Sequence, residues 1–479
     1  MLGSELMRGV AGVGGNPLAW RAVAGIDLVG VTADSRKAGP GMLFAALPGT
    51  RVNGCDFIAD AVRNGAAAVL APVGTVWPPG VPPRPMVVEA EPRQSLARVA
   101  AVLAGAQPAQ VVAITGTNGK TSTAEFLRQI WALAGRKAAS MGTLGLVAPG
   151  FDVGPGLTTP DPVTLAQTLA ALARAGVECA AIEASSHGLH QYRLDGVRLA
   201  AGAFTNLTRD HLDYHPDMAA YRDAKLRLFS ELLPEGAPAV ASLSLDGETL
   251  ALLREICLRR RLRLVLAGPE ACEPLADGQM VVWRGERLHL PLAGRFQADN
   301  AVLACALAEA TGIANARALM GQLVGVRGRM ELVGRLANGA AAYVDFAHTP
   351  DALDRLIAAL RPHTKGRLHL VFGAGGDRDP GKRPLMGAAA RAADVVIVTD
   401  DNPRTENPAA IRAAVLAGCP GALELGGREA AIAEGLAGLR AGDVLVVAGK
   451  GHEQGQTIGT VTHPFDDAGV IRELLAIAP

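Results

Sequence analysis

Short apolar runs rich in valine and isoleucine alternate along the chain with alanine- and leucine-rich stretches of helical pattern. Continuous apolar runs of strand length are typical of parallel strands whose two faces are covered by helices. The alternation therefore predicts an α/β fold throughout, with function at the polar loops that follow the strands. The clearest candidate strands are VVAIT (111–115), CAAIEAS (179–185), LHLVFG (368–373), DVVIVTD (394–400) and DVLVVAG (443–449).

The chain has 479 residues, which is enough for about three domains of ordinary size. Two breaks in the pattern are candidate boundaries, the polar segment AGAQPAQ at 104–110 and the glycine-rich segment VGRLANGAA at 333–341. They predict domains over residues 1–108, 109–333 and 334–479. The proline-rich segment at 72–85 is expected to be an extended connection, because proline disrupts helix interiors and central strands.

Composition favours small-molecule chemistry. The 46 basic and 46 acidic residues give a formal net charge of +0 and are scattered, so no basic footprint for nucleic acid or for an anionic membrane is visible. Six cysteines lie far apart without a CxxC pair, which favours reduced thiols over a disulfide framework or a zinc site. No run of 18 apolar residues occurs, so we expect no membrane insertion and a cytoplasmic protein.

The segment ITGTNGKTST follows the first strong candidate strand and opens a helical pattern. Backbone N–H groups at a helix N-terminus bind anions, and glycines let the chain approach phosphate oxygens closely. Ile114 stands where the common GxxxxGK[ST] spacing has its first glycine, so the loop is compressed, and a turn that binds nothing is the alternative. The predicted ATP-binding residues here are Gly116, Thr117, Asn118, Gly119, Lys120, Thr121 and Ser122. The predicted apolar face of the helix is Phe126, Leu127, Ile130, Trp131 and Leu133.

The loop TGTNGKT resembles the ATP-binding loop of the Mur ligases and of their relative folylpolyglutamate synthase. Further segments match the Mur ligases in family order, and the resemblance is to the branch that makes UDP-N-acetylmuramoyl-tripeptide. It implies an N-terminal α/β UDP-binding domain, a central P-loop ATPase-like domain and a C-terminal Rossmann-like domain. The matching segments are DSRKAGPGMLFAALPG (34–49), EASSHGLHQYR (183–193), NLTRDHLDYH (206–215), YRDAKLRLF (221–229), GRFQADNAVLA (294–304), GRME (328–331), DFAHTPDAL (345–353) and GAGGDRDPGKRP (373–384).

The resemblance also implies the chemistry. An amide ligase of this kind uses ATP to turn a carboxylate into an acyl phosphate, which an amine then attacks, so that catalysis is mainly positioning and charge stabilisation. Lys120 would neutralise the terminal phosphates, and Thr121 and Glu183 would hold a Mg²⁺ ion. His211 and Lys225, the latter as N6-carboxylysine, would hold a second Mg²⁺ ion.

Without the resemblance, these residues have simpler interpretations. Glu183 at a strand end is about as well explained as a capping carboxylate. His211, between two aspartates, suits a solvated turn, and Lys225 lies where an exposed lysine on a helix would be ordinary. The match of YRDAKLRLF to the family segment with a carbamylated lysine overrides this alternative for Lys225, and those for Glu183 and His211 stay open. Carbamylation needs a neutral amine, and hence an environment that lowers the lysine pKa.

Three further residues would contact ATP if the family pattern holds. Asn300 would contact the adenine, and a helix cap is a second role that is compatible with that contact. Arg329 and Asp345 would meet phosphate and ribose, on either side of a hinge that suits domain closure. The segment DFAHTP has phenylalanine at position 346 where the family usually has tyrosine, and little consequence is expected.

The resemblance assigns the UDP-N-acetylmuramoyl-L-alanyl-D-glutamate substrate to residues of the first two domains. Hydroxyl and cationic side chains suit an anionic ligand, although each of them could be an ordinary loop residue. The residues so assigned are Ser35, Thr158, Thr159, Ser185, Gln191 and Arg193.

The segment TDDNPRTENP at 399–408 would select the third substrate. In diaminopimelate-adding members of the family, the arginine of DNPR pairs with a carboxylate that meso-diaminopimelate has and lysine lacks. Asn407 and Pro408 also form a good helix start, but that does not explain Arg404. The resemblance further implies that Arg378 takes the other carboxylate and that Gly449 and Glu453 receive the far amino end. The residues assigned to diaminopimelate are Arg378, Asp401, Asn402, Pro403, Arg404, Gly449 and Glu453. A lysine-adding or other Mur ligase, a regulatory P-loop ATPase and folylpolyglutamate synthesis remain alternatives, and a monomer is expected.

Overall fold

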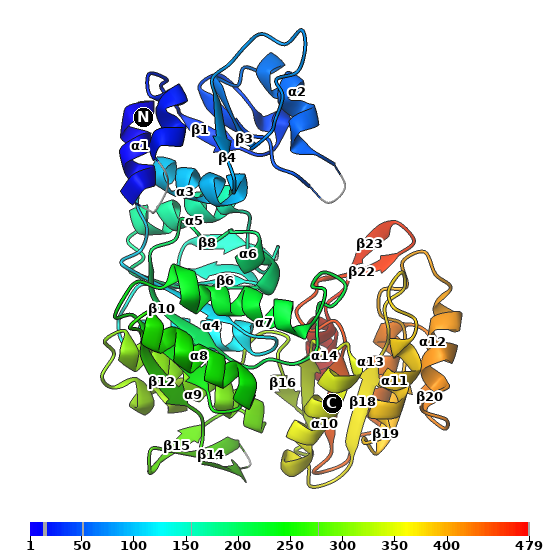
Figure 1. The fold of residues 1–479 in the computed structure, drawn as a ribbon. Helices are drawn as coiled ribbons and strands as arrows, with labels where there is room; N and C mark the ends of the chain where they lie inside the picture. The colour runs from blue at the N-terminus through cyan, green and yellow to red at the C-terminus, as the bar shows by residue number, and fades with distance from the viewer. Residues whose placement is uncertain (13–16, 50–51, 155, 276, 478–479) are drawn as a thin grey trace. The chain divides into compact units, whose positions relative to one another are not determined.

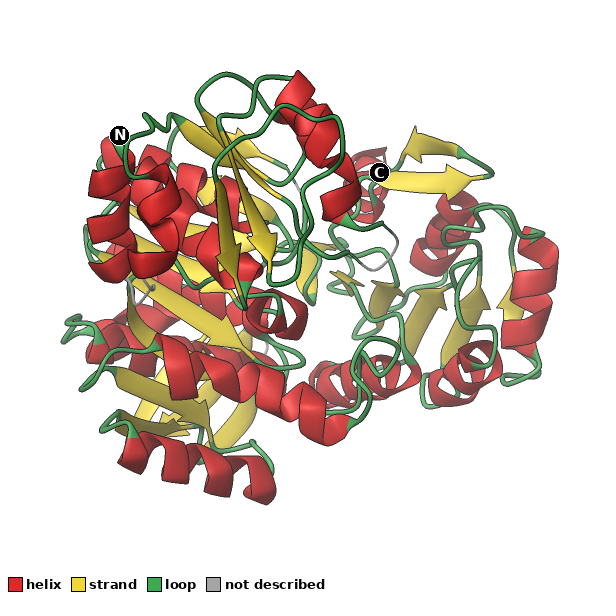
Figure 2. Cartoon of the chain, turned by 45° about the horizontal axis from the view of Figure 1, so that its top comes forward, coloured by secondary structure: helices red, strands yellow, loops and turns green. Residues whose placement is uncertain are grey.

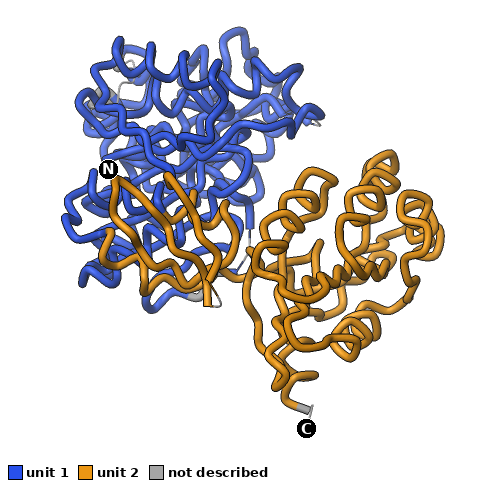
Figure 3. Tube along the Cα trace, turned by 90° about the horizontal axis from the view of Figure 1, so that it is seen from below, with its two compact units in different colours: residues 1–268, 302–316 blue, residues 269–301, 317–479 orange. Residues whose placement is uncertain are grey.

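The computed structural model describes residues 1–12, 17–49, 52–154, 156–275 and 277–477. The chain forms two compact units, residues 1–268 with 302–316 and residues 269–301 with 317–479 (Figure 3). Each unit is mixed α/β, as the alternating sequence pattern predicts. Within the described ranges, no helix is both long and apolar enough to cross a membrane.

The first unit begins with a parallel sheet of strand order β1-β2-β3-β4. Its strands are β1 (Gly30–Thr32), β2 (Met42–Ala45), β3 (Ala68–Pro72) and β4 (Met86–Glu89), and its α-helices are α1 (Gly3–Gly12), α2 (Ile58–Arg63) and α3 (Pro92–Ala104). Residues 73–85, between β3 and β4, contain neither helix nor strand, as the prolines predict. Apolar side chains of α1 and α3 pack on one face of this sheet and those of α2 on the other.

A larger sheet of order β12-β11-β10-β5-β9-β6-β7-β8 follows in the same unit (Figure 1). From β12 to β6 all neighbours are parallel, and β7 and β8 add antiparallel strands at the edge. Its strands are β5 (Gln110–Thr115), β6 (Ala138–Gly142), β7 (Gly145–Ala148), β8 (Phe151–Val153), β9 (Cys179–Glu183), β10 (Leu199–Phe204), β11 (Pro238–Ser242) and β12 (Arg263–Ala267). Its helices are α4 (Lys120–Leu133), α5 (Pro162–Arg174), α6 (Ser186–His190), α7 (Met218–Arg227) and α8 (Gly247–Arg259).

Helix α4 buries most of the apolar face predicted from the sequence. Phe126, Leu127, Ile130 and Trp131 are fully buried, whereas Leu133 is 40 % exposed, so its assignment to that face was wrong. Leu133 is the last residue of the helix, and the chain turns away directly after it. Helix α9 (Arg295–Ala310) contains Asn300 in its second turn rather than before its first, so the helix-cap role considered for Asn300 is also wrong.

The second unit contains a small antiparallel sheet and a larger, mainly parallel one (Figure 2). The small sheet consists of β13 (Ala271–Leu275), β14 (Gly278–Trp283) and β15 (Glu286–Leu290). The larger sheet has the order β16-β17-β21-β18-β19-β20, in which only the edge pair β16–β17 is antiparallel. Its strands are β16 (Glu331–Arg335), β17 (Ala341–Asp345), β18 (Leu368–Phe372), β19 (Val395–Val398), β20 (Leu423–Glu424) and β21 (Val444–Ala448).

Helices cover both faces of this six-stranded sheet, as in Rossmann-like folds. Side chains of α10 (Pro350–Leu360), α11 (Lys382–Ala390) and α12 (Pro408–Leu416) form one core cluster with the sheet, and those of α13 (Arg428–Ala437) and α14 (Asp467–Ile477) form the other. Asn407 caps α12 through the N–H of Ala409, with Pro408 as its first residue. A hairpin of β22 (Gly455–Ile458) and β23 (Val461–Pro464) follows β21. All five strands predicted from the sequence are therefore present.

Candidate active site

The glycine loop joins the end of β5 to the start of α4. Gly116 has φ +141° and Gly119 has φ +82°, values that favour glycine over other residues. A β-carbon on Gly116 would lie 1.8 Å from Oγ1 of Thr205, so the loop also needs glycine there for space. Lys120 is the first residue of α4, and its Nζ donates to the carbonyl oxygens of Gly116 (3.0 Å) and Thr117 (2.8 Å). The loop thus presents backbone N–H groups and a lysine at a helix N-terminus, as phosphate binding requires.

Residues just after β10 hold the glycine loop in place. Oγ1 of Thr205 donates to the carbonyl of Asn118 (2.6 Å), and the N–H of Asn118 donates to Oδ1 of Asn206 (3.0 Å). The N–H of Thr117 donates to the carbonyl of Asn206 (2.8 Å). Thr121 and Ser122 are buried at 8 % and 4 % exposure in the first turn of α4. The loop is therefore pre-shaped by protein contacts.

Lys225 on α7 is buried below this loop, with 1 % of its surface exposed. Its Nζ donates to the carbonyl of Gly116 (2.7 Å) and lies 4.4 Å from the ring centre of Tyr221. Burial, and next the nearby charge of Lys120, hold the pKa of Lys225 well below its usual value. The alternative of an ordinary exposed lysine is wrong. The amine has the low pKa that carbamylation requires.

Glu183 ends β9, the strand beside β5. Its Oε1 accepts a hydrogen bond from the N–H of Thr143 (2.8 Å) and its Oε2 accepts one from Oγ1 of the same residue (3.2 Å). The Thr143 hydroxyl also lies 3.3 Å from that of Thr158. Glu183 therefore fixes the turn after β6, and this capping role is compatible with metal binding because each carboxylate oxygen can accept more than one bond.

His211 lies in the loop after β10, in the left-handed conformation with φ +52°. Its side chain is 45 % exposed, and its Nε2 lies 3.6 Å from the Asp210 carboxylate. Its ring is 4.9 Å from that of His187 and 6.1 Å from that of Tyr221, centre to centre. Desolvation, followed by the attraction of Asp210 and the opposing charge of Lys120, leaves the pKa of His211 below its usual value. The neutral imidazole that a metal requires is thereby favoured.

Thr159, Ser185, Gln191 and Arg193 form one connected group. The Thr159 hydroxyl donates to the carbonyl of Glu183 (2.8 Å) and accepts from the N–H of Ser185 (2.9 Å). Arg193 donates through Nη1 to the carbonyl of Thr159 (2.6 Å) and through Nη2 to Oε1 of Gln191 (2.8 Å). Ser185 also caps α6 by accepting from the N–H of Gly188. Through Gln191 and Arg193, this group links the end of β9 to a pocket.

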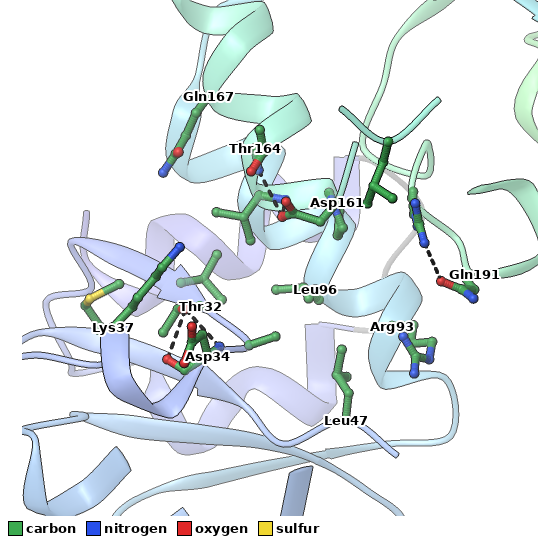
Figure 4. Close-up of a pocket in the computed structure, with 17 residues that line it drawn as sticks. Thr32, Asp34, Lys37, Leu47, Arg93, Leu96, Asp161, Thr164, Gln167 and Gln191 are labelled. Atoms are coloured by element: carbon green, nitrogen blue, oxygen red, sulfur yellow. Dashed lines mark hydrogen bonds between the residues drawn. The ribbon is translucent and has the colours of Figure 1, made fainter. Parts of the chain in front are cut away.

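This pocket has a volume of about 500 Å³ and lies in the first unit (Figure 4). Gln191 and Arg193 line it together with Lys37, Arg93 and Asp161, whose side chain caps α5. Ser35, Thr158, Thr159 and Ser185 are not among its described lining residues; Ser35 belongs to a short 3₁₀ helix, Ser35–Lys37, whose last residue faces the pocket. The lining carries three cationic side chains and two acidic ones, Asp34 and Asp161, and the excess of positive charge suits an anionic ligand.

The remaining predicted ATP contacts lie in the second unit. Asp345 ends β17 and accepts hydrogen bonds from the N–H groups of Met330 and Ala347, both at 2.7 Å. Burial raises the pKa of Asp345 while the Arg329 charge opposes that shift. The Arg329 guanidinium lies 4.5 Å from the ring centre of Phe346. This cation–π contact uses the aromatic ring that DFAHTP shares with the usual family sequence. Asn300 is buried at 6 % exposure.

The segment DNPR follows β19 and is joined to the glycine-rich loop that follows β18. Nη1 of Arg404 donates to the carbonyl of Gly376 (2.7 Å), and the N–H of Gly376 donates to the carbonyl of Asn402 (2.9 Å). The Thr405 hydroxyl donates to Asp377 (2.8 Å). Arg404 has φ +50° and is half-buried. Its side chain thus lies against the loop that follows β18.

The other residues assigned to the amino acid surround this loop. Asp401 and Asn402 are 8 % and 7 % exposed, and Pro403 is buried. A β-carbon on Gly449, at the end of β21, would lie 2.6 Å from Oδ2 of Asp401. Glu453 accepts a hydrogen bond from Nδ2 of Asn402 (2.9 Å). The structure therefore brings these five residues together.

Arg378, in contrast, is exposed in the loop after β18. A β-carbon on Gly375 would lie 3.8 Å from Cγ of Arg378 and 3.0 Å from Nη1 of Arg404. The two arginines therefore border the same glycine.

Several supporting residues were not singled out from the sequence. Thr143 and Asn206 hold Glu183 and the phosphate loop, and Tyr221, fully buried, places its hydroxyl 3.1 Å from that of Thr117. The Tyr214 hydroxyl accepts from Nε2 of Gln191 (3.0 Å). Lys450, next to Gly449, is fully buried. Tyr214, Asn206 and Tyr221 belong to segments that the family resemblance had marked, which was the available signal; Thr143 offered none.

A glycine loop that opens a helix between parallel strands, beside a buried lysine, defines a nucleotide-binding protein of the P-loop class. Family models described as "Mur ligase family, catalytic domain", "Mur ligase middle domain" and "Mur ligase, glutamate ligase domain" match residues 27–104, 114–308 and 328–451. The chain belongs to the Mur ligase family.

Similar proteins cover nearly the whole chain. A curated protein of Caulobacter vibrioides named UDP-N-acetylmuramoyl-L-alanyl-D-glutamate--2,6-diaminopimelate ligase is 53 % identical over 460 residues, which cover 92 % of this chain and 94 % of that protein. One of Mesorhizobium japonicum with the same name is 50 % identical and covers 98 % and 99 %. A solved structure of a ligase of that name is 32 % identical, covers 94 % and 95 %, and has a TM-score of 0.69.

Proposed function

We propose that the protein is an ATP-dependent ligase that joins meso-2,6-diaminopimelate to UDP-N-acetylmuramoyl-L-alanyl-D-glutamate, in the cytoplasmic synthesis of peptidoglycan precursors. The names of relatives about half identical over nearly their whole length support this assignment. The structural observation that carries the choice of amino acid is Arg404, which lies in the loop after β19 and is held against the loop that follows β18.

ATP would place its phosphates on the glycine loop. The N–H groups at the start of α4 and the Lys120 ammonium would oppose the phosphate charge. Asn300, Arg329 and Asp345 are assigned to the remainder of the nucleotide through the family pattern. The hydrogen bonds from β10 to the loop support this function, because a loop already fixed in shape loses little conformational entropy when phosphate binds.

Mg²⁺ prefers oxygen donors, and the donors assigned to it are Thr121, Glu183, His211 and Lys225 as its carbamate. Among the described residues there is no cluster of three acidic, histidine or cysteine side chains that could hold a metal. Thr121 and Glu183 would hold one ion. A carbamate on Lys225 would offer the second ion, beside His211, an anionic oxygen donor in place of an ammonium group, so the modified lysine fits that ion better than the unmodified one. Bound there, the ion would neutralise phosphate charge during phosphoryl transfer.

Lys225 would acquire the carbamate without an enzyme. A neutral amine attacks CO₂ and releases one proton, leaving N–COO⁻ in place of the ammonium. The lowered pKa of the buried Lys225 supports this step. Nζ retains one hydrogen after the reaction, so its bond to the Gly116 carbonyl can persist.

The reaction would follow the scheme of its family. The D-glutamyl carboxylate would take the terminal phosphoryl group of ATP and release ADP. The neutral amine would then attack the acyl phosphate, and the tetrahedral intermediate would lose phosphate and a proton to give the amide. The cationic pocket of the first unit would hold the nucleotide-sugar, through Gln191 and Arg193 among others, with Ser35, Thr158, Thr159 and Ser185 as further contacts. In the second unit, Arg404 would pair with the carboxylate that distinguishes diaminopimelate from lysine.

The decisive experiment measures phosphate release from ATP with UDP-N-acetylmuramoyl-L-alanyl-D-glutamate and a panel of amino acids. We expect turnover with meso-diaminopimelate and at least about 100-fold less with L-lysine, because Arg404 would lack its carboxylate partner. Turnover with L-lysine alone would assign the protein to another branch of the family. Hydrolysis that ignores the nucleotide-sugar would instead indicate a regulatory ATPase.

A further inference from the structure

Lys450 is a buried cation that the proposed chemistry leaves without a role. It follows Gly449 at the end of β21, and its side chain has no exposed surface. Its Nζ donates to Oδ1 of Asn402 and to Oε2 of Glu453, both at 3.1 Å. Burying an ammonium group costs several kcal/mol unless partners compensate for its lost hydration. The two bonds are therefore necessary to keep it there.

Both donors near Glu453 converge on the same carboxylate oxygen. Nδ2 of Asn402 donates to Oε2 at 2.9 Å, the oxygen that also accepts from Lys450. Oδ1 of Asn402 additionally accepts from the N–H of Thr457 at 2.9 Å, so the amide orientation is fixed by the backbone of β22. For Oε1 of Glu453, the described part of the chain supplies no recorded hydrogen bond, and the side chain is 39 % exposed. Glu453 thus has one oxygen that accepts two hydrogen bonds and one that accepts none from the described residues.

The family pattern assigns the far amino end of the amino-acid substrate to Gly449 and Glu453. We propose that Lys450 and Asn402 are positioning residues that hold Glu453 by Oε2 and so leave Oε1 for that ammonium group. This inference rests on the proposed function, because it takes diaminopimelate as the ligand. Asn402, assigned to ligand binding from the sequence, acts mainly through Glu453. Without the far ammonium group, the fixed carboxylate loses its partner, so the arrangement selects for that group.

The test compares meso-diaminopimelate with L-2-aminopimelate, which retains the reacting amine and both carboxylates but lacks the far amino group. Lys450→Met removes one donor to Oε2. Asn402→Asp keeps Oδ1 for Lys450 and Thr457 and replaces the amide donor by an oxygen that repels Glu453. Lys365→Met is the matched control, because Lys365 is an exposed lysine of the same unit. Thermal unfolding establishes that each variant is folded.

We expect kcat/KM for meso-diaminopimelate to fall at least about 10-fold in both variants, since 1.4 kcal/mol of misplaced pairing corresponds to that factor. With L-2-aminopimelate we expect kcat/KM of the two variants to change by less than about threefold. The control variant Lys365→Met should match the wild type with both substrates. Should Lys450→Met fail to fold, Asn402→Asp alone decides. Equal losses with the two substrates, or no loss, would overturn the positioning role.

The proposed function fails in a different way. A wild-type protein that forms no product from diaminopimelate and the nucleotide-sugar would overturn that function and this inference together. Wild-type turnover that prefers diaminopimelate over L-2-aminopimelate, with the same preference in both variants, would overturn the inference alone.

Discussion

A β-carbon on Gly142 would lie 2.0 Å from Oε1 of Glu183. The last residue of β6 therefore provides the space that the carboxylate at the end of β9 occupies. Thr143, the next residue, then donates its N–H to the same oxygen. The position of Glu183 therefore depends on the absence of a β-carbon at Gly142 as well as on the hydrogen bond from Thr143.

Gly142→Ala should displace the Glu183 carboxylate and reduce ATP-dependent phosphate release at least about 100-fold, a loss typical of misplaced catalytic groups. Because the change is confined to two strand ends, the fold should persist. Steady-state kinetics and circular dichroism would measure both effects. Gly247→Ala is the control, since a β-carbon there would meet no other part of the chain within 4 Å. An unimpaired Gly142→Ala variant would show that the position of Glu183 does not matter for the reaction.

Arg404→Ala should raise the KM for diaminopimelate by about 10- to 1000-fold and leave the KM for ATP nearly unchanged, because a charge-assisted bidentate pair contributes a few kcal/mol. Arg404→Lys retains the charge but loses the planar pairing, so it should restore only part of the affinity. Initial rates with each substrate varied in turn give both constants. Equal increases in the two constants would mean that Arg404 mainly supports the loop through Gly376.

Lys225→Ala should lose most activity, by a factor of at least about 100, because it removes the group assigned to charge stabilisation. Short carboxylic acids added to the variant should restore part of the rate, because they replace the carboxylate of the carbamate. Mass spectrometry under native conditions should detect the added CO₂ on the wild type. Full activity in the variant, or a lack of rescue together with an unmodified wild type, would refute the carbamate role.

Arg428→Ala should lower the free energy of unfolding by about 3 to 5 kcal/mol, because it leaves a charge buried without its partner. Arg428 and Asp467 are both fully buried and pair at 2.7 Å, and Arg428 also donates to the carbonyl of Ala448. Denaturant titration measures the loss, with exposed Arg391→Ala as the control. Replacing both partners by leucine should recover much of the stability; if it does not, the backbone bond matters more than the charge.

The stability of the fold should decline between pH 6.5 and pH 4 partly through His452. Burial, and next the charges of Arg329 and Arg327, lower the pKa of His452 to about 4. Below pH 6.5 the His452 imidazole is protonated in the unfolded chain, whereas in the folded chain it stays neutral down to about pH 4. Acid therefore favours unfolding between these two pH values.

His452→Gln should make this dependence shallower, as measured by denaturant midpoints at several pH values. Some dependence should remain, because the pKa of His215 is also lowered to about 4. A slope identical to that of the wild type would show that His452 does not titrate in this range.

The sequence was sufficient for the fold because its signals are local. The five valine- and isoleucine-rich runs are strands in the structure, and the Asn407–Pro408 pair starts a helix as its residue types predict. Leu133 shows where such signals fail. The helical period places it on the apolar face, but the helix ends at that residue and the chain no longer holds it against the sheet.

The supporting residues of the site could not be found in this way. The bond between Thr143 and Glu183 joins residues 40 positions apart, and that between Lys450 and Asn402 joins residues 48 apart. Such pairs depend on strand order, which periodicity does not reveal. The burial of Lys225 was likewise invisible, because a lysine in a helical pattern is usually exposed.

Arg404 is held by main-chain atoms on every side. Its N–H donates to the carbonyl of Thr457, its carbonyl accepts from the N–H of Gly459, and its guanidinium donates to the carbonyl of Gly376. Two of those positions are glycines. A β-carbon on Gly376 would lie 1.9 Å from the carbonyl oxygen of Pro403, and Gly459 has φ +61°, so side chains are disfavoured at both. A small-molecule inhibitor built to pair with this guanidinium would therefore meet an anchor whose supporting positions tolerate few substitutions.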